Sequence, residues 1–175
     1  MKTKLLFSYV VVSLLVSVSL CQSTKPALSA EKDVAVAKIG KSSIATVIGK
    51  IPIRILISNY QINIGKPEEE PPSERKNNCT YSSYPCSQVS NLQIWVKGKE
   101  LFVPRSVFAD CTDVRSMRIE KNAGAYVLIL SGGDASEAYG VKIFFNTDQI
   151  TKRDVYDLES NSLRQTTTYM PIIVD

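Results

Sequence analysis

The sequence has no histidine among its 175 residues. Histidine supplies the general base of Ser-His-Asp and Cys-His nucleophile systems, and it is a frequent ligand of zinc. Its absence excludes both kinds of nucleophile system and any histidine-bound zinc site. Catalysis by carboxylates, lysine or tyrosine stays open, but no motif supports it. We therefore expect a protein that is not an enzyme and that uses no cofactor and no metal.

The sequence also has little net charge, with a formal value of +4. Two of the basic residues, Lys2 and Lys4, lie in a segment that we expect to be removed. Recognition of nucleic acid needs a concentrated basic face, so we expect no nucleic-acid partner. The hydrophobic share of 44% and the charged share of 22% are ordinary for a globular protein with a packed core.

The N-terminus has the order of a secretory signal peptide. Two lysines come first, an apolar stretch from Leu5 to Leu20 follows, and a polar segment comes after Cys21. The stretch is shorter than the about 20 apolar residues that cross a bilayer. We predict a signal peptide over residues 1–21, a flexible leader over 22–33, no transmembrane segment after removal of the signal, and a periplasmic or secreted location.

Cys21 has two alternative fates. It is removed if cleavage follows it, or it carries a lipid anchor, because "VSLC" loosely resembles a bacterial lipobox. Leu20 departs from that pattern, which prefers a small residue just before the cysteine. The sequence leaves both fates open, with the lipid anchor as the lesser alternative.

The remaining cysteines predict one disulfide. In an oxidising compartment Cys79, Cys86 and Cys111 leave one odd thiol. The stretch "NNCTYSSYPC" holds Cys79 and Cys86 in one short polar loop, and closing that loop would stabilise the fold by about 2–3 kcal/mol. We predict a Cys79–Cys86 bridge and a buried, unpaired Cys111. A Cys86–Cys111 bridge is the competing pairing.

Residues 34–175 read as a single β-rich domain. Runs such as 51–64 and 91–104 are rich in β-branched residues and alternate apolar with polar, which is typical of strands. The segment 65–78 is a charged, proline-rich loop that we expect to be exposed and mobile. Short turns join about seven or eight strands, so the sequence predicts a mainly β protein, either an antiparallel β-sandwich or a strongly bent sheet, with one or two short helices.

The segment 128–145 reads as a hairpin with a polar centre. Gly132 and Gly133 are expected to supply positive φ angles there. Asp134 and Glu137 fall short of a calcium cage, which takes about six to eight oxygens. We interpret the centre as a structural turn, not a ligand loop.

The aromatic side chains divide into two groups. Most fall in strand patterns and are expected in the core. Tyr81 and Tyr84 lie outside any strand, on the loop that the Cys79–Cys86 bridge would constrain. Tyrosine on a constrained loop is a good contact residue, so we predict that both tyrosines bind a partner.

The sequence thus favours an exported, non-catalytic binding protein with a protein partner, such as an inhibitor or immunity protein against an enzyme that acts in the cell envelope. The alternative is a small-molecule or glycan-binding module. A third reading is a carboxylate-dependent hydrolase that uses pairs such as Asp110 with Asp113 or Asp154 with Asp157. That reading requires two carboxyl groups that face each other across a cleft.

Overall fold

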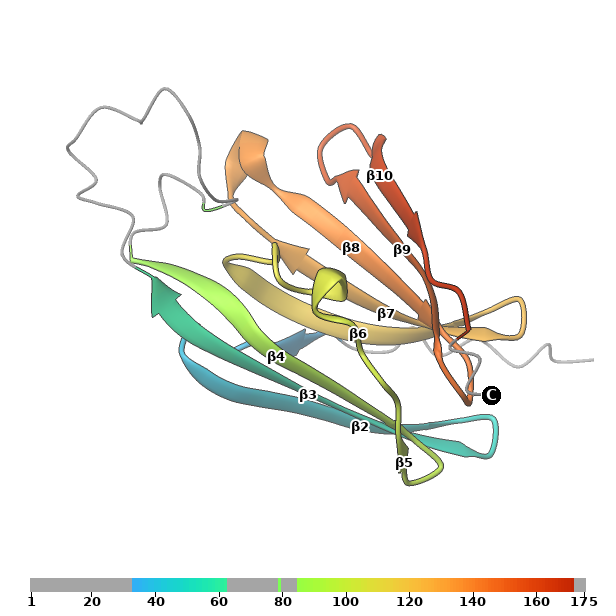
Figure 1. The fold of residues 1–175 in the computed structure, drawn as a ribbon. Coiled ribbons are helices and arrows are strands. Elements are labelled where there is room, and N and C mark those ends of the chain that lie inside the picture. The colour runs from blue at the N-terminus through green and yellow to red at the C-terminus, as the bar shows by residue number, and fades with distance from the viewer. Residues whose placement is uncertain (1–32, 63–78, 80–84, 172–175) are drawn as a thin grey trace, which may run out of the picture.

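The computed structural model describes residues 33–62, 79 and 85–171. Ten strands form two antiparallel sheets that face each other (Figure 1). One sheet has six strands in the order β1-β6-β7-β8-β9-β10, and the other has four in the order β2-β3-β4-β5. The predicted signal peptide, nearly all of the leader and the loop 65–78 fall outside these residues.

The six-stranded sheet contains β1 (Val34–Ala35), β6 (Val114–Asn122), β7 (Ala125–Gly132), β8 (Tyr139–Phe145), β9 (Ile150–Asp157) and β10 (Leu163–Thr168). The four-stranded sheet contains β2 (Gly40–Ile48), β3 (Ile51–Ile62), β4 (Cys86–Val96) and β5 (Lys99–Glu100). Two short 3₁₀ helices, η1 (Arg105–Val107) and η2 (Ala135–Glu137), complete the described elements. The predicted antiparallel β-sandwich with short helices is confirmed, and β1 and β5, each of 2 residues, are the strands beyond the expected number.

The core lies between the sheets and follows the alternation of the sequence. Ile53, Ile55 and Ile57 of β3 are at most 2% exposed. Leu92, Ile94 and Val96 of β4 are also at most 2% exposed and pack against the facing sheet. Burying an aliphatic side chain of this size contributes about 1.5–3 kcal/mol, so these two strands anchor the four-stranded sheet.

Strand β7 is buried on both of its faces. Residues 126–130 are all buried: Tyr126, Leu128 and Leu130 belong to the core cluster, and β6 and β8 flank the strand on either side. The run "AYVLIL" is continuously apolar, which is typical of a strand that is buried on both faces. On the outer face, Val127 pairs with Phe144 and Ile129 pairs with Lys142 of β8. The long side chains of these two partners lie beside Val127 and Ile129.

The predicted hairpin over 128–145 is confirmed as β7, η2 and β8. One detail of its interpretation was wrong. Gly133 has a positive φ of 74°, but Gly132 does not, and what requires a glycine at Gly132 is the ring of Tyr139 on the neighbouring strand, 2.8 Å from the place of a Cβ. Asp134 supports the turn, since it accepts a hydrogen bond from Ala135 N and pairs with Arg115 at 3.1 Å.

The expectation that the strand aromatics lie in the core holds only in part. Phe145, Tyr126 and Tyr139 are buried. Phe102 is 67% exposed, and the single tryptophan, Trp95, is only half-buried and lies on the outer face of β4. Trp95 alternates with the inward-facing Ile94 and Val96, so the pleat of the strand turns it away from the core.

Candidate functional site

The Cys79–Cys86 disulfide is present, with the Cα atoms 5.8 Å apart. Both residues are buried, and Cys86 is the first residue of β4. The competing Cys86–Cys111 pairing is wrong, because Cys111 is a free, buried thiol. Tyr81 and Tyr84, on the segment between the bridged cysteines, lie outside the described residues, and their role in partner binding stays a prediction.

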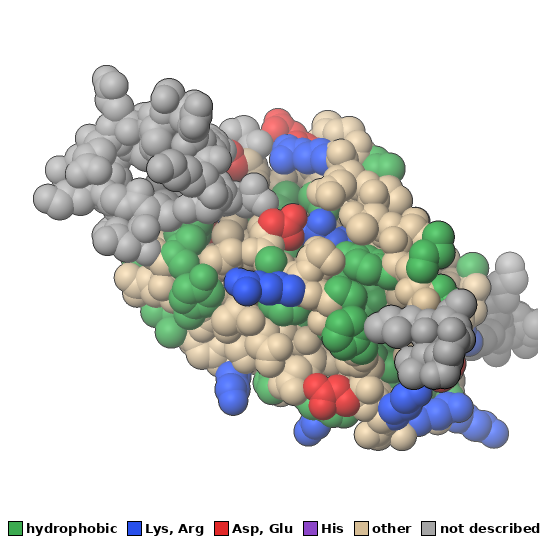
Figure 2. Space-filling view, in the orientation of Figure 1, with side chains coloured by type: hydrophobic (Ala, Val, Ile, Leu, Met, Phe, Trp, Pro, Cys, Tyr) green, Lys and Arg blue, Asp and Glu red, His purple; other side chains and the backbone are tan. Residues whose placement is uncertain are grey.

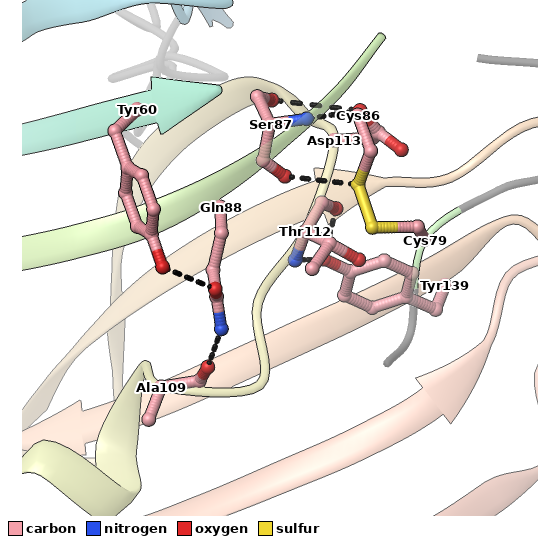
Figure 3. Close-up of a disulfide and its surroundings, with 9 residues drawn as sticks. All are labelled: Tyr60, Cys79, Cys86, Ser87, Gln88, Ala109, Thr112, Asp113 and Tyr139. Carbon is pink, nitrogen blue, oxygen red and sulfur yellow. Dashed lines mark hydrogen bonds between the residues drawn. A yellow bond between two sulfur atoms is a disulfide. The ribbon is translucent and has the colours of Figure 1, made fainter. Parts of the chain in front are cut away.

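The disulfide rests on a buried carboxylate (Figure 3). Asp113 accepts hydrogen bonds from the backbone N and the Oγ of Ser87, at 3.0 and 3.5 Å, and its own N donates to the Ser87 oxygen at 2.8 Å. Asp113 is 5% exposed and adopts a positive φ of 48°. These bonds fix the residue next to Cys86 and so hold the start of β4 in place.

A buried tyrosine fixes the neighbouring segment (Figure 3). The Tyr139 hydroxyl accepts a bond from Thr112 N at 2.8 Å and donates to Thr112 O at 2.5 Å. Burial raises the pKa of Tyr139 well above its ordinary value, so the hydroxyl stays protonated and keeps donating. Gln88 joins the same segment to β3, because it donates to Ala109 O and accepts from Tyr60.

We call the contacts among Cys79, Cys86, Ser87, Asp113 and Tyr139 the disulfide junction, and its hydrogen bonds stabilise the fold. Cys79, Cys86 and Asp113 place possible metal-ligand atoms within 4.8 Å of one another. The two sulfurs are bonded to each other, however, and a disulfide sulfur is not the thiolate that metals bind. The junction therefore holds the two ends of the loop on which Tyr81 and Tyr84 lie.

Cys111 sits in a second polar cluster in the interior. Arg153, which is 3% exposed, donates from Nη2 to Asp110 Oδ1 at 2.6 Å. Burial, and then the negative charge of Asp110, raise the pKa of Cys111 from 9.0 to about 12. Because only the thiolate is nucleophilic, this thiol is chemically inert in the folded protein.

We expect that iodoacetamide at pH 8 leaves Cys111 unmodified in the native protein and alkylates it fully in denaturant. The reason is that the buried thiol is neither ionised nor reachable. Mass spectrometry of the alkylated peptide measures the reaction. Rapid modification of the native protein would contradict this burial.

The raised pKa of Cys111 also predicts a dependence of stability on pH. Because the unfolded thiol ionises at lower pH than the folded one, the free energy of unfolding should fall as the pH rises above 9.0.

The outer face of the four-stranded sheet carries an open groove of about 580 Å³. Residues 45–47 of β2, residues 52–54 of β3, Trp95 and Gly98 line it. Arg54 and Trp95 are direct cross-strand partners, and the guanidinium of Arg54 lies 3.9 Å from the centre of the Trp95 ring. Such a stack stabilises by about 0.5–1 kcal/mol at an exposed site and holds both side chains in place.

Positive charge borders the groove. Lys50, in the β2–β3 turn, and Lys97, in the β4–β5 turn, are exposed. Within residues 33–62 and 85–171 neither lysine, nor Arg54, forms an ion pair, whereas Lys99 pairs with Asp148 at 3.6 Å. Figure 2 shows Lys and Arg side chains along the lower border of the molecule, with an acidic side chain among them, and Figure 1 places the turns of this sheet at the right-hand end of that border. The groove is therefore a largely apolar surface bordered by cations, with one exposed carboxylate, Glu100, as the cross-strand partner of Trp95.

The candidate carboxylate pairs are occupied by other contacts. Asp154 accepts from Thr166 at 2.8 Å and pairs with Lys152. Asp157 accepts from Ser160 N and pairs with Arg164, and these contacts, the Ser160 bond foremost, lower the pKa of Asp157 to about 2. Each carboxylate thus takes part in the local structure of its turn or strand.

Comparisons with protein-family models, with curated proteins and with solved structures give no match to this chain. Among the described residues, none of the helices has the length and hydropathy needed to cross a membrane.

Proposed function

We propose that this chain is an exported, non-catalytic protein that binds a protein partner through the groove at Trp95. One observation carries the proposal: the only tryptophan of the chain lies on an outer sheet face, stacked by a cation that has no ion-pair partner in the described structure. Tryptophan and arginine are the residue types most often found at the energetic centres of protein interfaces.

The groove favours a partner segment that is apolar and acidic. Val47, which is 68% exposed, and Pro52 offer apolar contact area on either side of the β2–β3 pairing. Arg54, Lys50 and Lys97 favour carboxylates at the border, and like charges on other proteins would be rejected. The partner therefore has an apolar anchor flanked by aspartate or glutamate.

A glycan-binding module fits the groove less well. Sugars stack on an open aromatic face, and the guanidinium of Arg54 lies over the Trp95 ring at 3.9 Å. A sugar would have to displace a stacked cation before it could contact the ring. A protein partner can instead pair a carboxylate with Arg54 and leave the stack intact.

Two features support export. A structural disulfide persists in oxidising compartments and is rare in the cytosol. The N-terminal segment has the pattern of a signal peptide. Within the class of binding proteins, we propose an inhibitor or immunity protein that acts on an enzyme of the cell envelope.

The test is partner capture from the envelope fraction, followed by titration of variants. Trp95→Ala should weaken binding by about 2 kcal/mol or more, about 30-fold, if Trp95 is the anchor. Arg54→Glu should also weaken binding and should reverse its dependence on salt, because it replaces an attractive charge by a repulsive one.

Leu163→Ala is the matched control. Leu163 is a large hydrophobic residue, 64% exposed, on β10 of the other sheet, so its removal should leave the affinity unchanged. The double variant Tyr81→Ala/Tyr84→Ala measures the predicted contribution of the loop, about 2 kcal/mol or more. Equal affinities for wild type and Trp95→Ala, with both proteins folded, would exclude the groove as the binding surface.

A further inference from the structure

The four sheet edges of the described structure are not alike. Strands β1 and β5 are edges of 2 residues each. The edge strand β10 carries a register irregularity between Leu163 and Gln165 and an ion pair between Arg164 and Asp157. Shortness, bulges and charges are the devices by which proteins keep sheet edges from pairing with other chains.

Strand β2, the fourth edge, has none of these devices along most of its length. It has 9 residues, "GKSSIATVI", contains no proline, and pairs with β3 without a register shift. Its only charged residue is Lys41, near one end. Within the described residues it has no strand neighbour other than β3. A long and regular edge whose single charge lies near one end is a template for a further strand.

The hairpin geometry shows which backbone groups of β2 point outward. The β2–β3 turn has two residues, 49 and 50, and Ile48 pairs with Ile51 beside it. In such a hairpin the flanking pair is hydrogen-bonded, and hydrogen-bonded pairs then alternate along the ladder. The even-numbered residues 40–48 therefore bond to β3, and Lys41, Ser43, Ala45 and Val47 direct their N–H and C=O groups to the open edge.

We propose that a second copy of this chain binds along β2, antiparallel, and joins the two four-stranded sheets into one. In the proposed register Ile44 lies opposite Ile44 of the second copy, and the positions of the outward N–H and C=O groups of β2 decide this register. It places Ser43 opposite Ala45, and Lys41 opposite Val47, in both directions. Only this register uses every outward N–H and C=O of the four residues, which makes eight hydrogen bonds between the copies. Neighbouring registers reach into the turn or beyond Gly40 and leave some of these groups unpaired.

The side chains agree with the same register. Lys41 lies opposite Val47 of the second copy and not opposite another lysine, so no like charges face each other between the two β2 strands. Val47, which is 68% exposed, gains cover from the aliphatic stem of that lysine. A twofold axis needs a self-complementary surface, and the backbone of an antiparallel edge is self-complementary.

The first test is the mass of the purified full-chain product by sedimentation equilibrium over a concentration series. Edge pairing makes a small interface, so we expect a weak dimer with a dissociation constant of about 100 μM. Ala45→Pro should raise the dissociation constant at least about tenfold, because proline removes an outward N–H and blocks the approach of another strand. The variant should stay folded, since this N–H makes no bond to β3. A wild type that remains monomeric at about 500 μM would overturn the proposal.

Two charge variants keep the test decisive if the proline variant fails to fold. Ser43→Glu/Ala45→Glu would face carboxylates against carboxylates across the axis and should give a monomer. Ser43→Lys/Ala45→Glu would face lysine against glutamate and should remain a dimer. Equal dimerisation of the two variants would overturn the proposed register. Ala45 also lines the groove at Trp95, so all three variants are measured by sedimentation of the chain alone, without a partner, which keeps the dimer test separate from partner binding.

Discussion

Replacing Gly133 with alanine is expected to lower the free energy of unfolding by about 3 kcal/mol or more. Gly133 has a φ of +74°, and a Cβ there would overlap the backbone oxygen of Glu137 and lie 3.0 Å from its carbonyl carbon. Its N–H also donates to Asp113 O at 3.3 Å. Relief of the overlap must move backbone, not a flexible side chain, and it would disturb the junction that supports the disulfide. Equilibrium unfolding in denaturant measures the loss.

Gly124→Ala is the matched control for this substitution. Gly124 also has a positive φ, +89°, but a Cβ there would meet nothing within 4 Å. Its alanine variant therefore carries the cost of the left-handed backbone alone, about 1–2 kcal/mol. The difference between the two variants isolates the steric contact at Gly133. Equal losses would show that the η2 turn can move away from a methyl group.

Removing the disulfide with Cys79→Ala/Cys86→Ala should lower the free energy of unfolding by about 2–3 kcal/mol. The bridge joins residues separated by 7 positions, and both sulfurs are buried, so the variant loses a constraint on the unfolded chain together with buried contacts. Thermal or denaturant unfolding of both proteins measures the change. Partner binding through Tyr81 and Tyr84 should weaken as well, because the loop would have to be ordered on docking.

A reductant supplies the control for the disulfide. Treatment of the wild type with a phosphine reductant should reproduce the loss of stability, and the double variant should not respond. Cys111 is unpaired, so it gives the reductant nothing further to break. A wild-type midpoint that is the same with and without reductant would contradict a stabilising role.

Local pattern was enough to predict the faces of the strands. Ile53, Ile55 and Ile57 share one parity, and Leu92, Ile94 and Val96 share another, so their burial follows from the pleat alone. The same parity argument, carried one step further, places Arg54 and Trp95 on the outer faces. That signal was present in the sequence, but strand-borne aromatics were assigned to the core as a group.

Cross-strand register was beyond the reach of local pattern. Arg54 meets Trp95 only because β3 and β4 pair across the long segment 63–85, and no residue in either strand encodes that register. The constraint on Gly132 likewise comes from Tyr139 on the adjacent strand. Asp113 and Tyr139 were missed for the same reason, since their roles depend on Ser87 and Thr112, which approach them through tertiary structure.

The order of the strands has a consequence for the speed of folding. Strands β2 to β5, and strands β6 to β10, each neighbour their successor in the chain, so both sheets are meanders whose ladders form by closing consecutive connections. Pairing between successive strands gives a lower contact order than pairing across the whole chain, and a lower contact order favours faster folding. The exception is β1, which pairs Val34 with Met117. Closing so long a loop carries a high entropic cost, so we expect β1 to add to its sheet last, after β6 and β7 have formed the surface that receives it.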